Sequence, residues 1–195
     1  MKQMLIIICA SLITTISALA QKSSQDKVEI STNPPPPALS FPVVKELGKA
    51  KAMYNQRADK LITQTAPIPV WGDRRRNIGL QAEFVSSGKK LVKPSSITLR
   101  FFSHASDRTY ADNRAVTIKL DGSEVLSETA HYEEGNTNGE IFLISVTQEV
   151  SYEMFSKILA AKKVEIKIGP TEFELNESGR EALRDLKKLI EQSSE

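Results

Sequence analysis

The residues with the clearest catalytic potential are the two histidines of the chain, His104 and His131. For hydrolysis they would need a nucleophile and an orienting acid, and Ser103 or Ser106 with His131 and Asp112 is the set that the composition offers. The chain has no G-x-S-x-G sequence to place a serine on a strained turn, and no H-E-x-x-H spacing to hold zinc. We therefore expect both histidines to lie in loops at the rim of the fold, and we expect no cofactor.

A polar segment at 133–140 has the alternating oxygen side chains found in the first half of a calcium-binding loop. Its candidate ligands are Glu133, Glu134, Asn136, Asn138 and Glu140. The first position of the loop is a glutamate instead of an aspartate, and the twelfth is a serine instead of a bidentate glutamate, which excludes an EF-hand. Two interpretations stay open: a weak calcium site, or a hairpin loop rich in Asn and Gly, which tolerate positive φ.

A compact basic cluster at 74–76 follows the only tryptophan of the chain, Trp71. Arg74, Arg75 and Arg76 can bind carboxylate or phosphate through their guanidinium groups, and an indole offers a face for stacking. We expect this cluster to bind a ligand or partner. The alternative is a solvated junction in which Trp71 covers the edge of the core.

The first twenty residues have the pattern of a secretory signal peptide. Lys2 is followed by an apolar run and then by Ala18-Leu19-Ala20, which matches an A-x-A cleavage site. The apolar run is shorter than the roughly 20 residues that a membrane-spanning helix requires. The sequence therefore predicts export, to the periplasm or the extracellular space, and a mature chain without an integral membrane span.

Composition narrows the remaining function classes. The single cysteine, Cys9, lies within the predicted signal peptide, so the mature chain would have neither a disulfide nor a thiolate site. The formal net charge is +2. A chain so close to neutral lacks the broad basic surface that nucleic-acid binding requires, and we expect no nucleic-acid partner.

Residues 21–42 and 43–66 form two further predicted regions. The first contains NPPPP at 33–37 and few large apolar residues, which predicts a disordered, proline-rich tether. In the second, apolar residues recur mostly at three- and four-residue steps, which predicts an amphipathic helix: Val44, Leu47, Ala50, Tyr54, Ala58, Leu61 and Ile62.

Residues 70–192 are predicted to form a β domain with a C-terminal helix. Several segments alternate apolar and polar residues, and Asp121-Gly122 is typical of a tight hairpin turn. Ser151 and Asn176 are predicted to cap helices at 152–161 and 177–192. The expected fold is mainly β, an antiparallel sandwich or half-barrel with N-terminal and C-terminal helices. An α+β arrangement is the alternative.

These features favour an exported, non-enzymatic protein whose β domain binds an envelope or extracellular partner or ligand. Two alternatives stay open. One is a secreted or periplasmic hydrolase that uses carboxylates such as Asp112, Glu133 and Glu134, because glycoside cleavage requires paired acids. The other is a passive structural component of the cell envelope, which would show a broad apolar patch and a stable oligomer.

Overall fold

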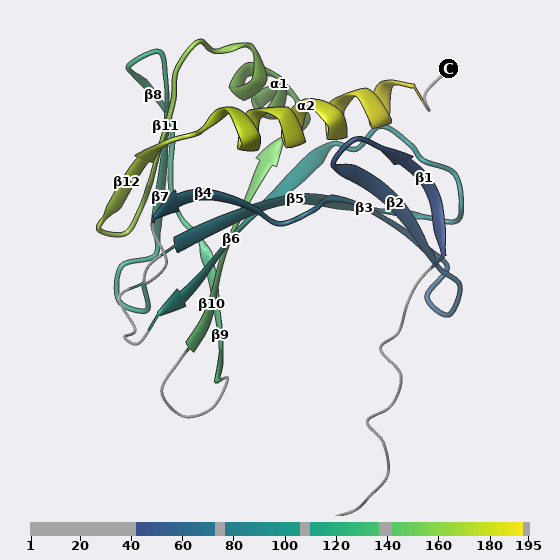
Figure 1. Ribbon diagram of the computed structural model, residues 1–195, viewed down its shortest axis with the longest axis horizontal. Coiled ribbons are helices and arrows are strands. Elements are labelled where there is room, and N and C mark those ends of the chain that lie inside the picture. The colour runs from purple at the N-terminus through teal and green to yellow at the C-terminus, as the bar shows by residue number, and fades with distance from the viewer. Residues whose placement is uncertain (1–41, 73–76, 106–109, 137–141, 193–195) are drawn as a thin grey trace, which may run out of the picture. The chain divides into compact units, whose positions relative to one another are not determined.

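Strands dominate residues 42–72, 77–105, 110–136 and 142–192, the parts of the chain that this computed structural model describes (Figure 1). The predicted signal peptide at 1–20 and the predicted tether, except its last residue, lie outside the described residues. The strands are β1 (Val43–Leu47), β2 (Ala50–Asn55), β3 (Lys60–Thr65), β4 (Ile68–Gly72), β5 (Asn77–Ser87), β6 (Ser96–Ala105), β7 (Ala115–Leu120), β8 (Ser123–Thr129), β9 (His131–Asn136), β10 (Phe142–Ser151), β11 (Val164–Ile168) and β12 (Thr171–Glu174). The helices are α1 (Tyr152–Ala160) and α2 (Glu177–Glu191). The predicted β-rich fold with helices is confirmed.

The larger sheet, called sheet A here, is antiparallel and has the order β1-β2-β3-β5-β6-β10-β9. Strand β4 also pairs with β5. β3 and β4 lie end to end along β5, because β3 pairs with residues 83–87 of β5 and β4 with residues 77–80. Pro67 lies between them and has no N–H to give to the ladder, which accounts for the interruption.

The smaller sheet, sheet B, has the order β12-β11-β7-β8, and its pairings are also antiparallel. The β7–β8 turn has Asp121 at φ 50° and Gly122 at φ 85°, as the Asp-Gly pair predicts. After this turn the chain forms two strands that belong to different sheets, because β8 pairs with β7 of sheet B and β9 pairs with β10 of sheet A.

The predicted helix at 43–66 is wrong, because this region forms β1, β2 and β3. The buried residues of β2 and β3 alternate with more exposed ones, which is the period of a strand, whereas the helical spacing came from apolar residues on both faces of the hairpins. Gly48 at φ 55° and Asp59 at φ 49° make the turns. The predicted boundary between helix and β domain therefore falls inside sheet A.

Both later helices lie where the sequence predicted them. Ser151 accepts a hydrogen bond from the Met154 backbone N at 3.1 Å and caps α1, and Asn176 accepts one from Gly179 N at 2.8 Å and caps α2. The Asn176 amide also donates to the Pro69 carbonyl at 3.0 Å, so the same side chain joins the start of α2 to β4.

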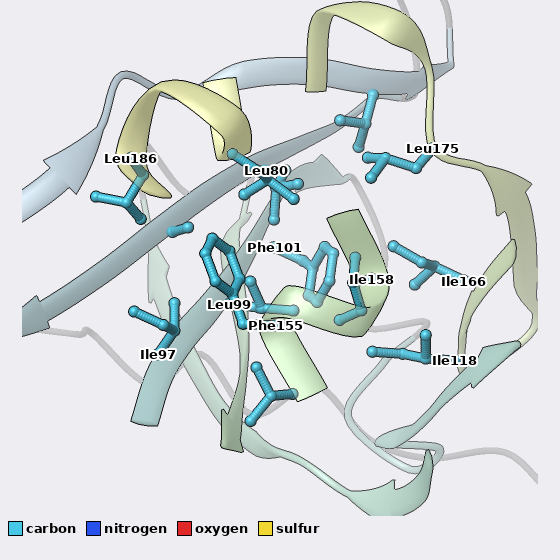
Figure 2. Close-up of a cluster of buried hydrophobic side chains, with 14 of the residues drawn as sticks. Leu80, Ile97, Leu99, Phe101, Ile118, Phe155, Ile158, Ile166, Leu175 and Leu186 are labelled. Carbon is cyan, nitrogen blue, oxygen red and sulfur yellow. The ribbon is translucent and has the colours of Figure 1, made fainter. Parts of the chain in front are cut away.

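One hydrophobic core joins both sheets and both helices. Helix α2 lies across one face of sheet A and contacts β1 to β5, while α1 contacts β6, β10 and α2 (Figure 1). Figure 2 shows side chains of β5, β6, β7, β11, α1 and α2 converging on this interior. The face of sheet A that packs on α2 is called the inner face below, and the opposite face the outer face.

The β1–β2 turn is attached to α2 by polar contacts. The Lys49 backbone N donates to Asp185 Oδ2 at 2.9 Å, and Lys49 Nζ donates to Glu181 Oε2 at 2.7 Å. The hydrogen bond from Lys49, together with its positive charge, holds the pKa of Glu181 below its ordinary value.

A pH titration tests this ion pair. Because the pKa of Glu181 is lowered on folding, the pair stabilises the fold above the ordinary pKa of a glutamate, and this contribution is lost as the pH falls through the lowered pKa. In Lys49→Gln, the pKa of Glu181 should rise toward its ordinary value. Carbon-detected NMR of the Glu181 carboxyl measures both values, and equal values in the two proteins would contradict the assignment.

Candidate binding site

Of the imagined Ser/His/Asp set, the described residues Ser103 and His131 do not come together. Ser103 is buried on the inner face of β6, where it pairs with Ile144, whereas His131 is exposed on β9 and pairs with Thr147. Ser103 and His131 are two strands apart in the sheet. Their partners on β10 are three residues apart, which adds a separation of about 10 Å in the strand direction. Ser106 lies outside the described residues, and Asp112 lies in the bend before β7.

His131 is correctly predicted to be exposed, but the expectation that both histidines lie in loops is wrong, because His131 begins β9 and His104 is in β6. Each of these strands pairs with β10, so sheet pairing extends further along the chain than the turn signals indicated.

The acidic segment at 133–136 is a strand and not a loop. Because successive side chains of a strand point to opposite faces, Glu133 and Glu134 lie on opposite sides of β9. Glu133 Oε1 lies 3.2 Å from His131 Nε2, while Glu134 Oε2 accepts a hydrogen bond from the Tyr132 hydroxyl at 2.7 Å. The two carboxylates therefore do not form the paired acids that glycoside cleavage would need.

The other candidate calcium ligands lie at the end of β9 or outside the described residues. Asn136 ends β9, and Asn138 and Glu140 lie outside the described residues. Within the described ranges, no three His, Cys, Asp or Glu side chains lie together so as to hold a metal ion.

The structure describes only part of the predicted basic cluster. Arg74, Arg75 and Arg76 lie outside the described residues. Trp71 is partly buried and packs against the core, as the junction interpretation expected. Gly72 and Asn77, on either side of the undescribed residues, pair with each other across β4 and β5.

A hollow of about 350 Å³, which we call the outer-face hollow, lies next to Asn77. It is lined mostly by apolar residues from four strands and the β3–β4 junction: Pro67, Ile68, Pro69, Asn77, Gly79, Phe102 and Leu143. Gly79 and Phe102 are paired across β5 and β6, and their sequence neighbours Leu80 and Phe101 are buried on the inner face. The hollow therefore opens on the face of sheet A that α2 leaves uncovered.

Gly79 keeps this hollow open. A Cβ atom placed on Gly79 would meet Ile68 O at 3.7 Å and Phe102 Cδ2 at 4.0 Å, both ordinary van der Waals distances. A Cβ atom would therefore fit without strain, and a longer side chain at this position would extend into the hollow. The sequence carried a signal for this site, since an isolated glycine within a strand suggests a close approach by a ligand or another backbone.

Leu143 is an exposed large hydrophobic residue at the hollow, with 37% of its surface accessible, while the next residue, Ile144, is fully buried on the inner face. Beside Phe102 on the outer face, the Arg100 guanidinium lies 6.0 Å from the ring centroid and donates to Glu83 Oε1 at 2.6 Å. Aromatic residues and arginine, which lie together in this patch, are enriched at protein interfaces.

No known protein family, curated protein or solved structure gives a significant match to the chain. Among the described residues, neither helix has the length and apolar character needed to cross a membrane.

Proposed function

We propose that the protein is an exported, non-enzymatic binding protein that holds an extracellular or periplasmic partner through the outer-face hollow. Export rests on the signal-peptide pattern of residues 1–20. Binding rests on the hollow itself, an apolar depression that the described residues leave uncovered, although a side chain at position 79 would extend into it.

The hollow favours a side chain of a partner polypeptide over a complete small-molecule ligand. Its volume of about 350 Å³ is at the lower end of the range for small-molecule pockets. Its walls are two prolines, an isoleucine, a glycine, a phenylalanine and a leucine, and Asn77 is the polar residue among the lining. We therefore expect the partner to insert one apolar or aromatic anchor, with Arg100 and Glu83 beside it for polar contacts.

Peptide selection from a random displayed library tests this proposal. Selected peptides should share an apolar anchor, and Gly79→Leu should weaken their binding about tenfold or more, because the leucine occupies the space of the anchor. The matched control is Val85→Phe, which also adds bulk to the outer face of β5 but outside the hollow.

Two results would contradict the proposal. Equal binding by wild type and Gly79→Leu would show that the selected peptides use another surface. Equal weakening by Val85→Phe would show that any bulk on this face of the sheet disturbs binding. Far-UV circular dichroism of each variant establishes that the sheet is intact.

A further inference from the structure

A second cavity among the described residues is separate from the outer-face hollow. It has a volume of about 760 Å³ and lies where the end of α1, the end of β12 and the first turns of α2 meet. Its charged lining residues are Lys162, Glu174, Glu177, Arg180 and Arg184.

Arg180 is a buried cation without an anionic partner among the described residues. Only 9% of its surface is accessible, and its guanidinium donates to the carbonyls of Ala161 at 2.8 Å, Lys162 at 2.8 Å and Leu175 at 3.4 Å. These three acceptors are neutral, and no carboxylate within the described ranges forms an ion pair with Arg180. Buried charges in proteins are normally paired, so the charge of Arg180 lacks its usual compensation.

The guanidinium also keeps donors for a ligand. An arginine side chain carries five N–H groups. Three of those of Arg180 are directed at the carbonyls, and the other two form no hydrogen bond with a described residue, while Arg180 lines the cavity. The three carbonyls fix the plane of the group, which reduces the entropy lost when an oxyanion binds to it.

Two exposed cations lie on the same cavity. Lys162 forms no ion pair with any described residue, and Arg184 Nη1 is held by Glu177 Oε1 at 2.6 Å. Glu177 therefore both neutralises Arg184 and places a negative charge on the lining, where it would compete with an incoming anion.

We propose that this cavity binds the oxyanion group of a ligand, a carboxylate or a phosphate, between Arg180, Lys162 and Arg184. The oxyanion accepts hydrogen bonds from the two remaining N–H groups of Arg180. It also displaces the Glu177 carboxylate from the Arg184 guanidinium. This site is independent of the outer-face hollow and of the partner proposed for it.

Amide NMR titrations with sodium phosphate and with sodium acetate, each in a low-salt buffer without other oxyanions, test the proposal and distinguish the two chemistries. We expect saturable shifts at Ala161, Lys162 and Arg180 with at least one of the two anions. Lys162→Gln/Arg184→Gln should weaken binding about tenfold, because two charge-assisted contacts are lost. Lys187→Gln/Lys188→Gln removes the same charge from α2 outside the cavity and should leave binding within roughly twofold.

Glu177→Gln distinguishes anion binding at this cavity from a purely structural function of Lys162 and Arg184. It removes one of the two carboxylates on the lining, the one that holds Arg184, so binding should tighten by roughly threefold to tenfold. Shifts that do not saturate with either anion, or equal weakening by both double variants, would overturn the proposal. So would unchanged or weaker binding in Glu177→Gln.

Discussion

Replacing Phe155 by alanine should lower the free energy of unfolding by about 3–5 kcal/mol. Phe155 lies on α1, is fully buried, and belongs to the core that joins the two sheets (Figure 2). Truncation removes the apolar contacts of the ring and leaves a cavity between elements that already pack on one another, so the site cannot collapse fully. Guanidinium-induced unfolding, monitored by far-UV circular dichroism, measures the loss in the free energy of unfolding.

Val44→Ala is the control for this prediction. Val44 is on edge strand β1 with 53% of its surface accessible, so its truncation should change the free energy of unfolding by no more than about 0.5 kcal/mol. A loss below about 1 kcal/mol for Phe155→Ala would show that α1 contributes little to the core and would contradict the packing described here.

Gly169→Ala should cost about 3 kcal/mol, from two separate causes. Gly169 has φ 53°, a conformation in which an L-residue with a Cβ is strained by about 1–2 kcal/mol. In addition, its Cβ would lie 2.6 Å from the Asn113 carbonyl oxygen, so the backbone before β7 would have to move. Gly169 N also donates to Ala115 O at 2.9 Å, and this movement would disturb that hydrogen bond.

Gly88→Ala and Gly122→Ala separate the two causes. Both glycines have positive φ, at 71° and 85°, but a Cβ on either would meet no atom within 4 Å. Each control should therefore show the conformational cost alone, about 1–2 kcal/mol. If chemical unfolding gives the same loss for Gly169→Ala as for the controls, the close approach to Asn113 is not a constraint on the fold.

The C-terminal half of the fold could be predicted because its local signals agree with its tertiary environment. In α2, the apolar stripe of Leu183, Leu186, Leu189 and Ile190 is the face that the core buries, and Asn176 caps the helix as expected. The β7–β8 turn could be predicted from the Asp121-Gly122 pair, because the conformation of such a turn depends mainly on these two residues.

The helix predicted at 43–66 was wrong because small residues such as alanine do not distinguish the period of a helix from that of a strand. Ala50 and Ala52 are good helix formers, but here they are buried in β2, where α2 packs on the sheet. Tertiary packing therefore overrode helix propensity, and the weak helical spacing of the neighbouring apolar residues gave a false prediction.

The candidate sites could be predicted least, because each is assembled from segments that are distant in sequence. The outer-face hollow brings Pro67 and Gly79 together with Phe102 and Leu143, and no local spacing links these residues. The sequence drew attention to Glu133 and Glu134 because they are neighbours along the chain. In a strand, neighbouring side chains lie on opposite faces, so these two carboxylates do not form one site.

Site-specific photo-crosslinking tests most directly the central proposal, that the outer-face hollow holds a partner. A benzophenone amino acid replaces Leu143 at the hollow or, as a control, Val44, which is also exposed but lies outside the hollow. The chain is then irradiated in the cells that produce it. We predict one discrete crosslinked product from position 143, absent from position 44 and lost when Gly79→Leu is added. Crosslinking that is equal at both positions, or unchanged by Gly79→Leu, would contradict the proposal.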